Sequence, residues 1–585
     1  MQREDSAVPI ICFENFTFQY RSQSEPTLRQ IDLNIYPGEK ILIVGPSGSG
    51  KSTLGHCLNG IVPFFHAGEI TGSLQIKGVE TASMSLYDLS RYVGTVMQDP
   101  DGQFIGLTVA EDIAFALEND AVPVDIMRKK VNEMAAIVGM TPYLTASPHD
   151  LSGGQKQRVT MAGVMTHDAD IMLFDEPLAS LDPHTGKSSI EFIEQISRDT
   201  NKTIIIIEHR LEEVLHGHID RVIVMYDGRI VADLPPAELL QSKILRTYGI
   251  REPLYIAALR NAGVKISEIV HPENINSLDI IPIRSQLQAW MQSDPPHQNI
   301  AAQQPILEFQ SVTFGFIPDQ PVLQNITLSI HRGEMVSMIG KNGAGKSTLS
   351  RLICGSLKPQ SGEIKLDGQS LTNQTVKERA SRIGYVMQNP NQMLFKSMIA
   401  DEVGYGLTLR GLSAAEITER VMDCLHICGL YAYRNWPIAA LSYGQKKRVT
   451  IAAVLALDPE ILILDEPTAG QDLRHYTEIL HFVEKLNHER GLTIMMITHD
   501  MHLMLEYSNR ALVIADGQLI ADQHPSAVLS DLIITERANL KMTSLYTLAL
   551  RAGIPDPTAF IRQFILQDRE ERNQNDNLHA VLHSS

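Results

Sequence analysis

A phosphate-binding loop occurs twice in this chain of 585 residues. Each copy fits the pattern G-x-x-x-x-G-K-[ST], follows an apolar run typical of a β-strand and precedes a plausible helix. Glycines let backbone N–H groups converge on phosphate oxygens, and the helix N-terminus favours negative charge. The first copy comprises Gly45, Pro46, Ser47, Gly48, Ser49, Gly50, Lys51, Ser52 and Thr53, and the second comprises Gly340, Lys341, Asn342, Gly343, Ala344, Gly345, Lys346, Ser347 and Thr348. We expect the lysines to reach the β- and γ-phosphates and Ser52 and Ser347 to hold Mg²⁺.

The duplication extends over most of the chain. Other motifs recur 290 positions apart, from 98 to 388, 151 to 441, 175 to 465 and 209 to 499, whereas the loops lie 295 positions apart, from 45 to 340. A repeated unit of this length is a domain rather than a solenoid repeat. We expect domains at 1–248 and 305–535, a short helical extension and linker at 249–304 with its flexible part at 293–298, and a helical extension with a flexible tail at 536–585.

Composition limits the partners. A formal net charge of −18 argues against broad binding to nucleic acid, because such binding requires Lys and Arg. The five cysteines are scattered, which predicts a reducing compartment and no disulfide framework. Cys424 and Cys428 have only His426 as a nearby further ligand, so we interpret them as packing residues. No run of 18 apolar residues and no signal-peptide pattern occurs, so work at a membrane would require a partner.

Two apolar runs end in adjacent acidic residues, Asp175 with Glu176 and Asp465 with Glu466. Continuous apolar runs are typical of strands buried on both faces of a parallel sheet. We expect Asp175 and Asp465 to orient Mg²⁺, and Glu176 and Glu466 to act as general bases that polarise the attacking water. The alternative is a pair of solvated acids at a strand end, which the phosphate loops disfavour.

Histidine and glutamine end other strand-like runs. His209 and His499 follow apolar runs, and ligands of open α/β sheets bind at the carboxyl edge of the strands. We expect both histidines to contact the γ-phosphate, although a strand cap is the simpler alternative. Gln98 and Gln388 could contact Mg²⁺ or the attacking water through their amides. Taken alone, this glutamine pattern has low specificity.

Aromatic residues and a second anion-binding pattern complete the repeated set. Tyr20 and Phe316 precede their loops at matching positions, where they could stack on a nucleobase or belong to the core. After Leu151 and Leu441, a serine and a glycine at a helix start form an anion-binding turn. This pattern comprises Ser152, Gly153, Gly154 and Gln155 in the first half, and Ser442, Gly444 and Gln445 in the second.

Together these motifs resemble ATP-binding-cassette (ABC) ATPases with two nucleotide-binding domains in one chain, and Leu-Ser-Gly-Gly-Gln at 151–155 is highly specific for that family. The resemblance implies ATP hydrolysis with Mg²⁺ and an α/β fold of the P-loop NTPase type. Each domain would have a mainly parallel sheet, an antiparallel β subdomain and a helical signature subdomain. It also implies an intramolecular head-to-tail pair, in which loop 45–53 meets 442–445 and loop 340–348 meets 152–155. Asp182 and Asp472 match the D-loop at that interface.

A narrower resemblance is to the ATPase subunits of energy-coupling-factor transporters, which import vitamins and transition-metal ions. It rests on residues 98–104 and 108–115, with a looser copy at 388–406. It implies a peripheral motor at the cytoplasmic face of the cell membrane, with a transmembrane coupling protein and a small membrane substrate-binding protein as partners. A vitamin such as a thiamine precursor is the favoured substrate, and cobalt or nickel is the alternative.

A soluble twin-cassette ATPase acting on ribosomes or DNA is the alternative function. That class usually carries a strongly basic linker, whereas this linker has mixed charge. Two residues depart from the family pattern: Tyr443 replaces the first signature glycine, and Phe316 lacks the hydroxyl of the usual tyrosine. All the expected catalytic groups are present, which predicts two hydrolytically competent but mildly unequal sites.

Overall fold

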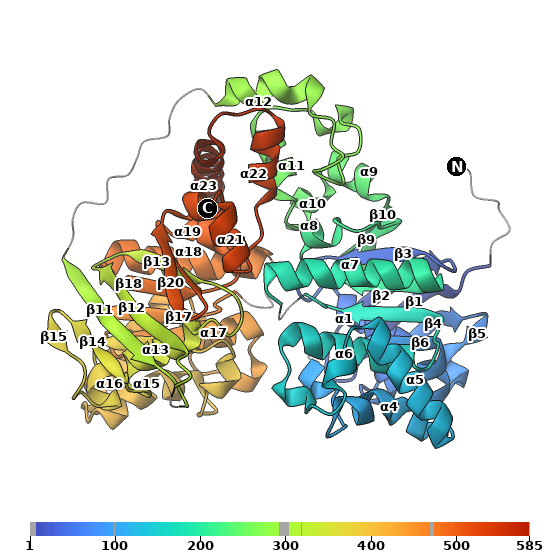
Figure 1. The fold of residues 1–585 in the computed structure, drawn as a ribbon, viewed down its shortest axis with the longest axis horizontal. Helices are drawn as coiled ribbons and strands as arrows, with labels where there is room; N and C mark the ends of the chain where they lie inside the picture. The colour runs from blue at the N-terminus through green and yellow to red at the C-terminus, as the bar shows by residue number, and fades with distance from the viewer. Residues whose placement is uncertain are drawn as a thin grey trace. The chain divides into compact units, whose positions relative to one another are not determined.

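The computed structural model describes residues 8–98, 100–178, 181–291, 304–317, 319–468 and 473–583. The chain divides into two compact units, Met1–Ile280 and Ile281–Ser585, and each is described by itself (Figure 1). The predicted flexible part of the linker, 293–298, and the predicted D-loop residue Asp472 lie outside the described residues. The domain boundaries expected at 248, 304 and 535 stay predictions.

The central sheet of the first unit has six strands in the order β10-β9-β3-β8-β7-β6. All neighbouring pairs are parallel except β9 and β10. Strands β3 and β8 are buried along their whole length, as their continuous apolar runs predict. The strands are β3 (Lys40–Val44), β6 (Val93–Val96), β7 (Ile171–Asp175), β8 (Thr203–Ile207), β9 (Arg221–Tyr226) and β10 (Arg229–Leu234).

An antiparallel sheet and a group of helices complete this unit. The sheet has the order β2-β1-β4-β5, with β1 (Ile11–Tyr20), β2 (Leu28–Ile35), β4 (Gly68–Ile76) and β5 (Val79–Glu80). Helices α4 (Val109–Asn119), α5 (Val124–Ile137) and α6 (Gly153–Met165) have a hydrophobic core of their own and lie together in Figure 1. The remaining helices are α1 (Lys51–Asn59), α2 (Ile61–Phe64), α3 (Leu86–Tyr92), α7 (Pro183–Thr200), α8 (Leu211–Val214), α9 (Pro236–Gln241), α10 (Ile244–Thr247) and α11 (Leu254–Asn261).

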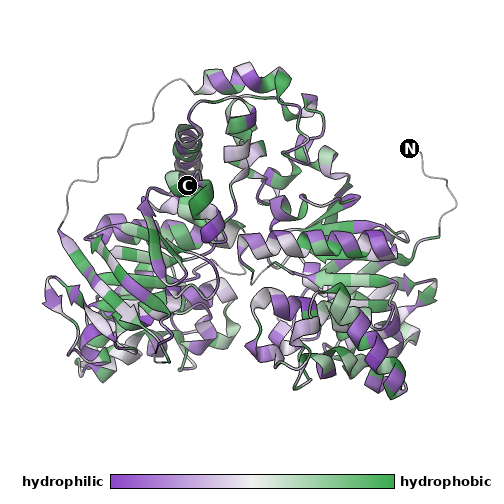
Figure 2. Cartoon of the chain, in the orientation of Figure 1, coloured by the Kyte–Doolittle hydropathy of each residue, from purple (hydrophilic) through white to green (hydrophobic). Residues whose placement is uncertain are grey.

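The second unit repeats both sheets. Its six-stranded sheet has the order β16-β17-β18-β13-β19-β20, and its antiparallel sheet the order β12-β11-β14-β15. The strands are β11 (Pro305–Phe314), β12 (Leu323–His331), β13 (Met335–Ile339), β14 (Ser361–Leu366), β15 (Gln369–Ser370), β16 (Ile383–Val386), β17 (Ile461–Asp465), β18 (Thr493–Ile497), β19 (Arg510–Ala515) and β20 (Gln518–Gln523). Apolar residues line the central strands of both units (Figure 2). The predicted tandem α/β architecture is therefore confirmed.

The helices of the second unit follow the same plan and add a C-terminal group. Helices α15 (Ile399–Leu409), α16 (Ala414–Ile427) and α17 (Tyr443–Leu455) form the helical subdomain. Cys424 and Cys428 are buried in its core. The others are α12 (Arg284–Trp290), α13 (Lys346–Cys354), α14 (Val376–Arg379), α18 (Leu473–Arg490), α19 (Met501–Tyr507), α20 (Pro525–Val528), α21 (Leu532–Arg537), α22 (Ser544–Arg551) and α23 (Pro557–His583).

Two segments in the predicted linker and tail regions are helical. Helix α12 packs on the C-terminal helices, where Trp290 Nε1 donates to Gln567 Oε1 at 2.9 Å and the Trp290 ring contacts Phe560. Helix α23 continues to His583 and so includes the segment from residue 569 on, where the sequence predicts a flexible tail. After Pro557 this segment contains no glycine or proline, so nothing in it interrupts the helix.

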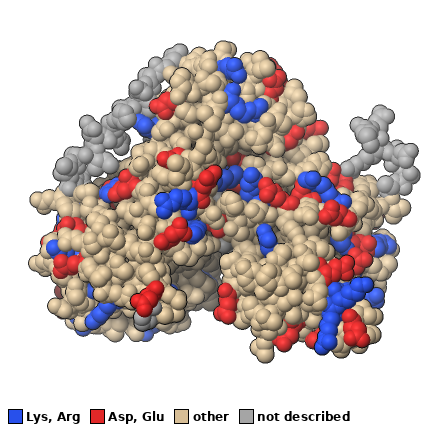
Figure 3. Space-filling view, viewed as in Figure 1, with Lys and Arg blue, Asp and Glu red and all other residues tan. Residues whose placement is uncertain are grey.

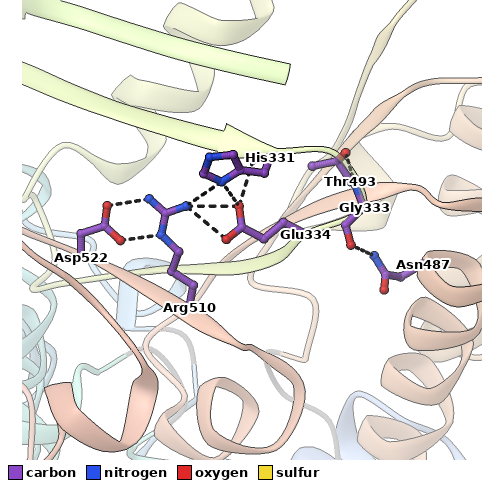
Figure 4. A network of polar contacts seen from close by, with 7 residues as sticks. All are labelled: His331, Gly333, Glu334, Asn487, Thr493, Arg510 and Asp522. Atoms are coloured by element: carbon purple, nitrogen blue, oxygen red, sulfur yellow. Dashed lines mark hydrogen bonds and ion pairs between the residues drawn. The ribbon is translucent and has the colours of Figure 1, made fainter. Parts of the chain in front are cut away.

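An ion-pair network fixes the strand that leads into each phosphate loop. In the second unit, Arg510 at the start of β19 binds Glu334 at 3.1 Å and Asp522 of β20 at 2.5 Å (Figure 4). In the first unit, Arg221 occupies the same place and binds Glu39 and Asp233. Glu39 and Glu334 directly precede the buried strands β3 and β13. The network therefore holds the first residues of each loop-bearing strand against its neighbours.

Arg379 stabilises only the second unit. Its buried guanidinium donates to the carbonyls of Leu352 and Ile353, at the end of α13, and of Leu371, at 2.5–3.1 Å. In the first unit, Leu89 stands 290 positions earlier. We expect Arg379→Leu to lower the free energy of unfolding of the second unit by about 2–4 kcal/mol, because buried carbonyls lose charged donors. The free energy of unfolding is measured by urea unfolding, followed through hydrogen exchange of the amides in α13. Lys377→Leu changes an exposed neighbour and should leave that free energy unchanged.

Candidate nucleotide sites

The first phosphate loop joins the end of β3 to the start of α1. Gly48 and Gly50 have φ angles of +77° and +98°, in the left-handed region that favours glycine. The side chain of Lys51 folds back into the loop, where Nζ donates to the carbonyls of Gly45 at 2.8 Å and Pro46 at 3.0 Å. Because Lys51 is only 4% exposed, its ammonium group is held inside the loop and has little contact with solvent.

A pocket of about 710 Å³ opens beside this loop. Its lining includes Tyr20, Lys51, Glu176 and His209, together with the segment 22–27. A volume of this size is typical of small-molecule sites. Two buried oxygens nearby, Ser49 Oγ and Asp175 Oδ1, have no hydrogen-bond partner among the residues that the structure describes. Orphaned oxygens next to a fixed lysine fit a bound phosphate and its cation.

Three residues predicted from separate motifs meet at one carboxylate. Glu176 Oε1 lies 2.8 Å from His209 Nε2, and Gln98 Nε2 donates to Glu176 Oε2 at 2.7 Å. The backbone of Glu176 has a φ of +48°, which is strained for a glutamate, and its N–H is held by the Ile207 carbonyl at 2.8 Å. Strained backbone conformations of this kind are frequent at functional sites.

The two adjacent acids have different electrostatics. Burial, together with the negative charge of Glu176, raises the pKa of Asp175 to about 6. Burial also acts to raise the pKa of Glu176, but the hydrogen bond and charge of His209 and the charge of Lys51 outweigh it and leave that pKa below its usual range. A bound cation would relieve the cost of ionising Asp175. Glu176 is ionised at neutral pH, as a proton acceptor must be.

The second unit repeats the loop and the carboxylate–histidine pair. Lys346 Nζ donates to the carbonyls of Gly340 at 2.6 Å and Lys341 at 3.0 Å. Glu466 again has a positive φ, +44°, and its Oε1 lies 2.7 Å from His499 Nδ1. The histidine therefore uses Nδ1 here and Nε2 in the first unit. Both histidines contact the glutamate, a contact that the sequence did not predict.

The second site differs from the first around its aspartate. The hydroxyl of Tyr385 donates to Asp465 Oδ2 at 2.6 Å, whereas Thr95 stands at the equivalent position of the first unit. Burial raises the pKa of Asp465, and the bond from Tyr385 opposes that shift. Between the described side chains of Gln388 and Glu466 no hydrogen bond forms. The sequence alone gave no signal for Tyr385, because a tyrosine in a strand is common.

The two predicted stacking residues lie in different settings. Tyr20 lines the 710 Å³ pocket, and its hydroxyl lies 3.1 Å from Thr53 Oγ1 of α1. Phe316 is exposed, and its ring makes an edge contact with Phe314. Phenylalanine has no hydroxyl, so Phe316 cannot make a hydrogen bond equivalent to the one between Tyr20 and Thr53 of α1.

The signature residues begin helices α6 and α17. The backbone N–H of Ser152 donates to Gln155 Oε1 at 2.9 Å, and that of Ser442 donates to Gln445 Oε1 at 3.0 Å. These bonds form a capping arrangement that fixes the first turn of each helix. Of the described residues that line the 710 Å³ pocket, none belongs to 152–155.

Asp182 is buried and caps α7, where its Oδ1 accepts from the backbone N–H of Thr185 at 3.0 Å. The first turn of α7 is therefore fixed by this carboxylate. Among the helices in the described part of the chain, none combines the length and the apolar composition needed to cross a lipid bilayer.

Comparison with known proteins places both halves in one family. Residues 28–179 and 323–469 match a family model described as ABC transporter, and residues 242–314 match one described as ATP-binding cassette cobalt transporter. A putative ABC transporter ATP-binding protein of Clostridium perfringens (strain 13 / Type A) is 54% identical over 564 residues, covering 96% of this chain and 99% of that protein. A similarly described protein of Vibrio vulnificus (strain CMCP6) is 50% identical over 560 residues, covering 96% of this chain and 98% of that protein. A solved structure of cbiO1 from Clostridium perfringens, described as part of the ABC transporter complex cbiONQ, is 33% identical, covers 40% of this chain and 95% of its own, and has a TM-score of 0.38.

Proposed function

Because the chain belongs to the ATP-binding, ATP-hydrolysing proteins of ABC transporters, we propose that it is the motor of an energy-coupling-factor importer. In this role it binds and hydrolyses ATP at two sites and drives uptake of a micronutrient through membrane partners. It lies at the cytoplasmic face of the cell membrane, held there by a transmembrane coupling protein and a small substrate-binding protein.

Each site is assembled from residues of both halves. Lys51 and Lys346 bind the phosphates, and Mg²⁺ is held by Ser52, Gln98 and Asp175 in the first half and by Ser347, Gln388 and Asp465 in the second. Bound Mg²⁺ would neutralise the negative charge that develops on the phosphates. The signature segments 442–445 and 152–155 close over loops 45–53 and 340–348 respectively, because a second anion-binding turn is otherwise unused within its own half.

The catalytic steps of the chain itself centre on Glu176 and Glu466. Each carboxylate accepts a proton from the attacking water as the water approaches the γ-phosphate. His209 and His499 orient these carboxylates through the contacts of 2.8 and 2.7 Å. In the first half, the amide of Gln98 holds the other oxygen of Glu176.

One observation carries the proposed link to a membrane partner. The segments that follow Gln98 and Gln388 present outward-facing apolar side chains, with Leu107 83% and Phe395 75% exposed. These segments are nevertheless fixed, because Asp112 accepts from the backbone N–H groups of 105 and 106, and Glu402 from those of 395 and 396. A rigid loop with exposed apolar side chains fits docking of a hydrophobic partner.

The surface charge fits this role better than nucleic-acid binding. On the face drawn in Figure 3, acidic and basic side chains are interspersed rather than gathered into one basic field. The net charge of −18 acts in the same direction. The twin-cassette function on ribosomes or DNA is therefore not favoured.

The proposed substrate is a micronutrient, either a vitamin such as a thiamine precursor or a cobalt or nickel ion. The sequence resemblance favours the vitamin, and the family model matched at 242–314 is described as a cobalt transporter. The ligand bound to the co-purified substrate-binding partner, identified by mass spectrometry, distinguishes them. ATP-driven uptake of labelled thiamine, cobalt and nickel then shows which of these substrates the transporter imports.

Docking is tested with the variants Leu107→Asp and Phe395→Asp in the full chain. We expect each to release most of the chain from membranes and to lower uptake at least about tenfold, because a buried carboxylate is costly at an apolar interface. ATP hydrolysis by the isolated chain should stay unchanged. Val376→Asp, at an exposed apolar position of α14, is the matched control. Full membrane retention of both docking variants, or association with ribosomes instead of membranes, would contradict the proposal.

A further inference from the structure

The two halves differ where the signature helix meets the glutamine loop. We use "glutamine loop" for the residues that directly follow β6 and β16, starting at Met97 and Met387. Helices α6 and α17 lie beside these loops in their respective units. The helices carry different side chains at the two positions that face the loop, 153 and 157 in the first half and 443 and 447 in the second.

In the second half, two side chains of α17 bind the backbone of the glutamine loop. Lys447 is only 1% exposed, and its Nζ donates to the carbonyls of Met387 at 2.7 Å and Gln388 at 2.9 Å. The hydroxyl of Tyr443 donates to the Gln388 carbonyl at 3.1 Å. Hydrogen bonds from a buried cation are stronger than those between neutral groups. Three bonds to two adjacent carbonyls therefore join the loop to the helix.

In the described part of the first half, the equivalent side chains make no hydrogen bond to the loop. Gly153 has no side chain, and Gln157 turns away, with Nε2 donating to the carbonyl of Pro177 at 2.8 Å and Oε1 accepting from Ser189 Oγ at 2.6 Å. A cavity of about 120 Å³ is lined by residues of both the loop and the helix, among them Met97, Gln98, Gly153 and Gln157.

The exchange involves a third position. Ser189, the partner of Gln157, corresponds to Ile479, which is buried and cannot donate a hydrogen bond. A glutamine at 447 would therefore lack that partner, whereas the lysine finds its partners in the loop. The two halves therefore differ at both positions, and each residue pair fits the contacts of its own half.

The first half keeps one weaker link between loop and helix. Lys156 Nζ lies 2.7 Å from Asp101 Oδ1, but the Asp101 side chain is 51% exposed, and exposed pairs of this kind contribute little. In the second half, Asn391 stands in place of Asp101, and its contact with Lys446 is 3.4 Å long. The strong attachment is thus buried in the second half, and the weak one is exposed in the first.

We propose that Lys447 is a positioning residue for ATP hydrolysis that, with Tyr443, joins the second glutamine loop to its signature helix, while the first loop is linked to α6 more weakly, through the exposed Lys156–Asp101 pair. In the second half, a shift of the glutamine loop must carry α17 with it. In the first half, a movement of Gln98 to and from Glu176 displaces α6 less, because the Lys156–Asp101 pair is exposed and weak. The proposal rests on the ATP hydrolase activity of the chain and does not depend on the substrate or the membrane partners.

Hydrogen–deuterium exchange of the full chain without nucleotide tests the attachment directly. We expect Lys447→Met to speed exchange of the amides in 387–396 by about tenfold or more and to leave those in 100–107 unchanged. Gln157→Met is the matched variant of the first half and should not speed exchange in 100–107, because the hydrogen bonds of Gln157 join it to Pro177 and Ser189. Tyr443→Phe removes one bond only and should raise exchange in 387–396 by about two- to threefold, so it serves if Lys447→Met fails to fold.

The attachment should also be transferable. In the double variant Gln157→Lys/Ser189→Ile, the first half receives the pair found in the second, and exchange in 100–107 should slow. For Lys447→Met, kcat for ATP hydrolysis per folded chain should fall about fivefold while KM stays within twofold. The folded fraction is measured by circular dichroism, because unfolded chains would lower the apparent kcat without changing KM. Unchanged exchange in 387–396 in a folded Lys447→Met chain, or a parallel change in kcat and KM, would overturn the proposal.

Discussion

The double variant Glu176→Gln/Glu466→Gln is expected to hydrolyse ATP about 10²–10⁴-fold more slowly than the parent chain, while its affinity for ATP stays within a few-fold. Glutamine has the shape of glutamate and can still accept a hydrogen bond from His209 or His499. It cannot accept the proton of the attacking water. Phosphate release in the steady state and nucleotide binding by calorimetry measure the two quantities separately.

The two single variants show how the sites share the work. Each half has its own glutamate–histidine contact and its own buried lysine, so Glu176→Gln and Glu466→Gln should each lower hydrolysis and transport. The different surroundings of Asp175 and Asp465 predict unequal losses. The control is Glu191→Gln, which changes an exposed acid of α7. If one single variant keeps full hydrolysis and transport, the expectation that both sites are needed is wrong.

The fold and the first set of site residues were predictable because they depend on local sequence. A glycine-rich turn between a strand and a helix fixes the phosphate loop, and continuous apolar runs fix the buried strands. Parallel strands bring their carboxyl ends to one edge, so the sequence placed Glu176 and His209 at the same edge but did not predict their direct contact. Gln98 follows β6, as predicted, and there its side chain donates to Glu176, whereas its contact with Mg²⁺ or the attacking water stays a prediction.

Other contacts could not be predicted, because they depend on the distance between segments far apart in the chain. Lys447 looks like one more basic residue of a solvent-facing helix, yet it is buried on two backbone carbonyls. Its role becomes visible only beside Gln157 and Ser189, whose contact requires the position of α7. The position of α12 likewise depends on packing against α22 and α23 rather than on its own sequence.

The double variant Lys51→Met/Lys346→Met is expected to weaken ATP binding by about 10²-fold or more at each site. A charge-assisted hydrogen bond contributes roughly 1.5–3 kcal/mol, and tenfold in affinity corresponds to about 1.4 kcal/mol. Lys51 and Lys346 are already desolvated and fixed by loop carbonyls, so little reorganisation opposes their contact with phosphate. Methionine fills similar space without the charge, which keeps the loops packed.

Thermal unfolding with and without ATP provides the measurement, because a ligand that binds only the folded chain raises its melting temperature. The parent and the Glu176→Gln/Glu466→Gln chain should both show this rise, and the Lys51→Met/Lys346→Met chain should not. Lys187→Met, which changes an exposed lysine of α7, should behave as the parent. If the lysine variant kept the rise but lost hydrolysis, the two lysines would act on the transition state alone, and ATP affinity would have to come from the backbone N–H groups of the loops.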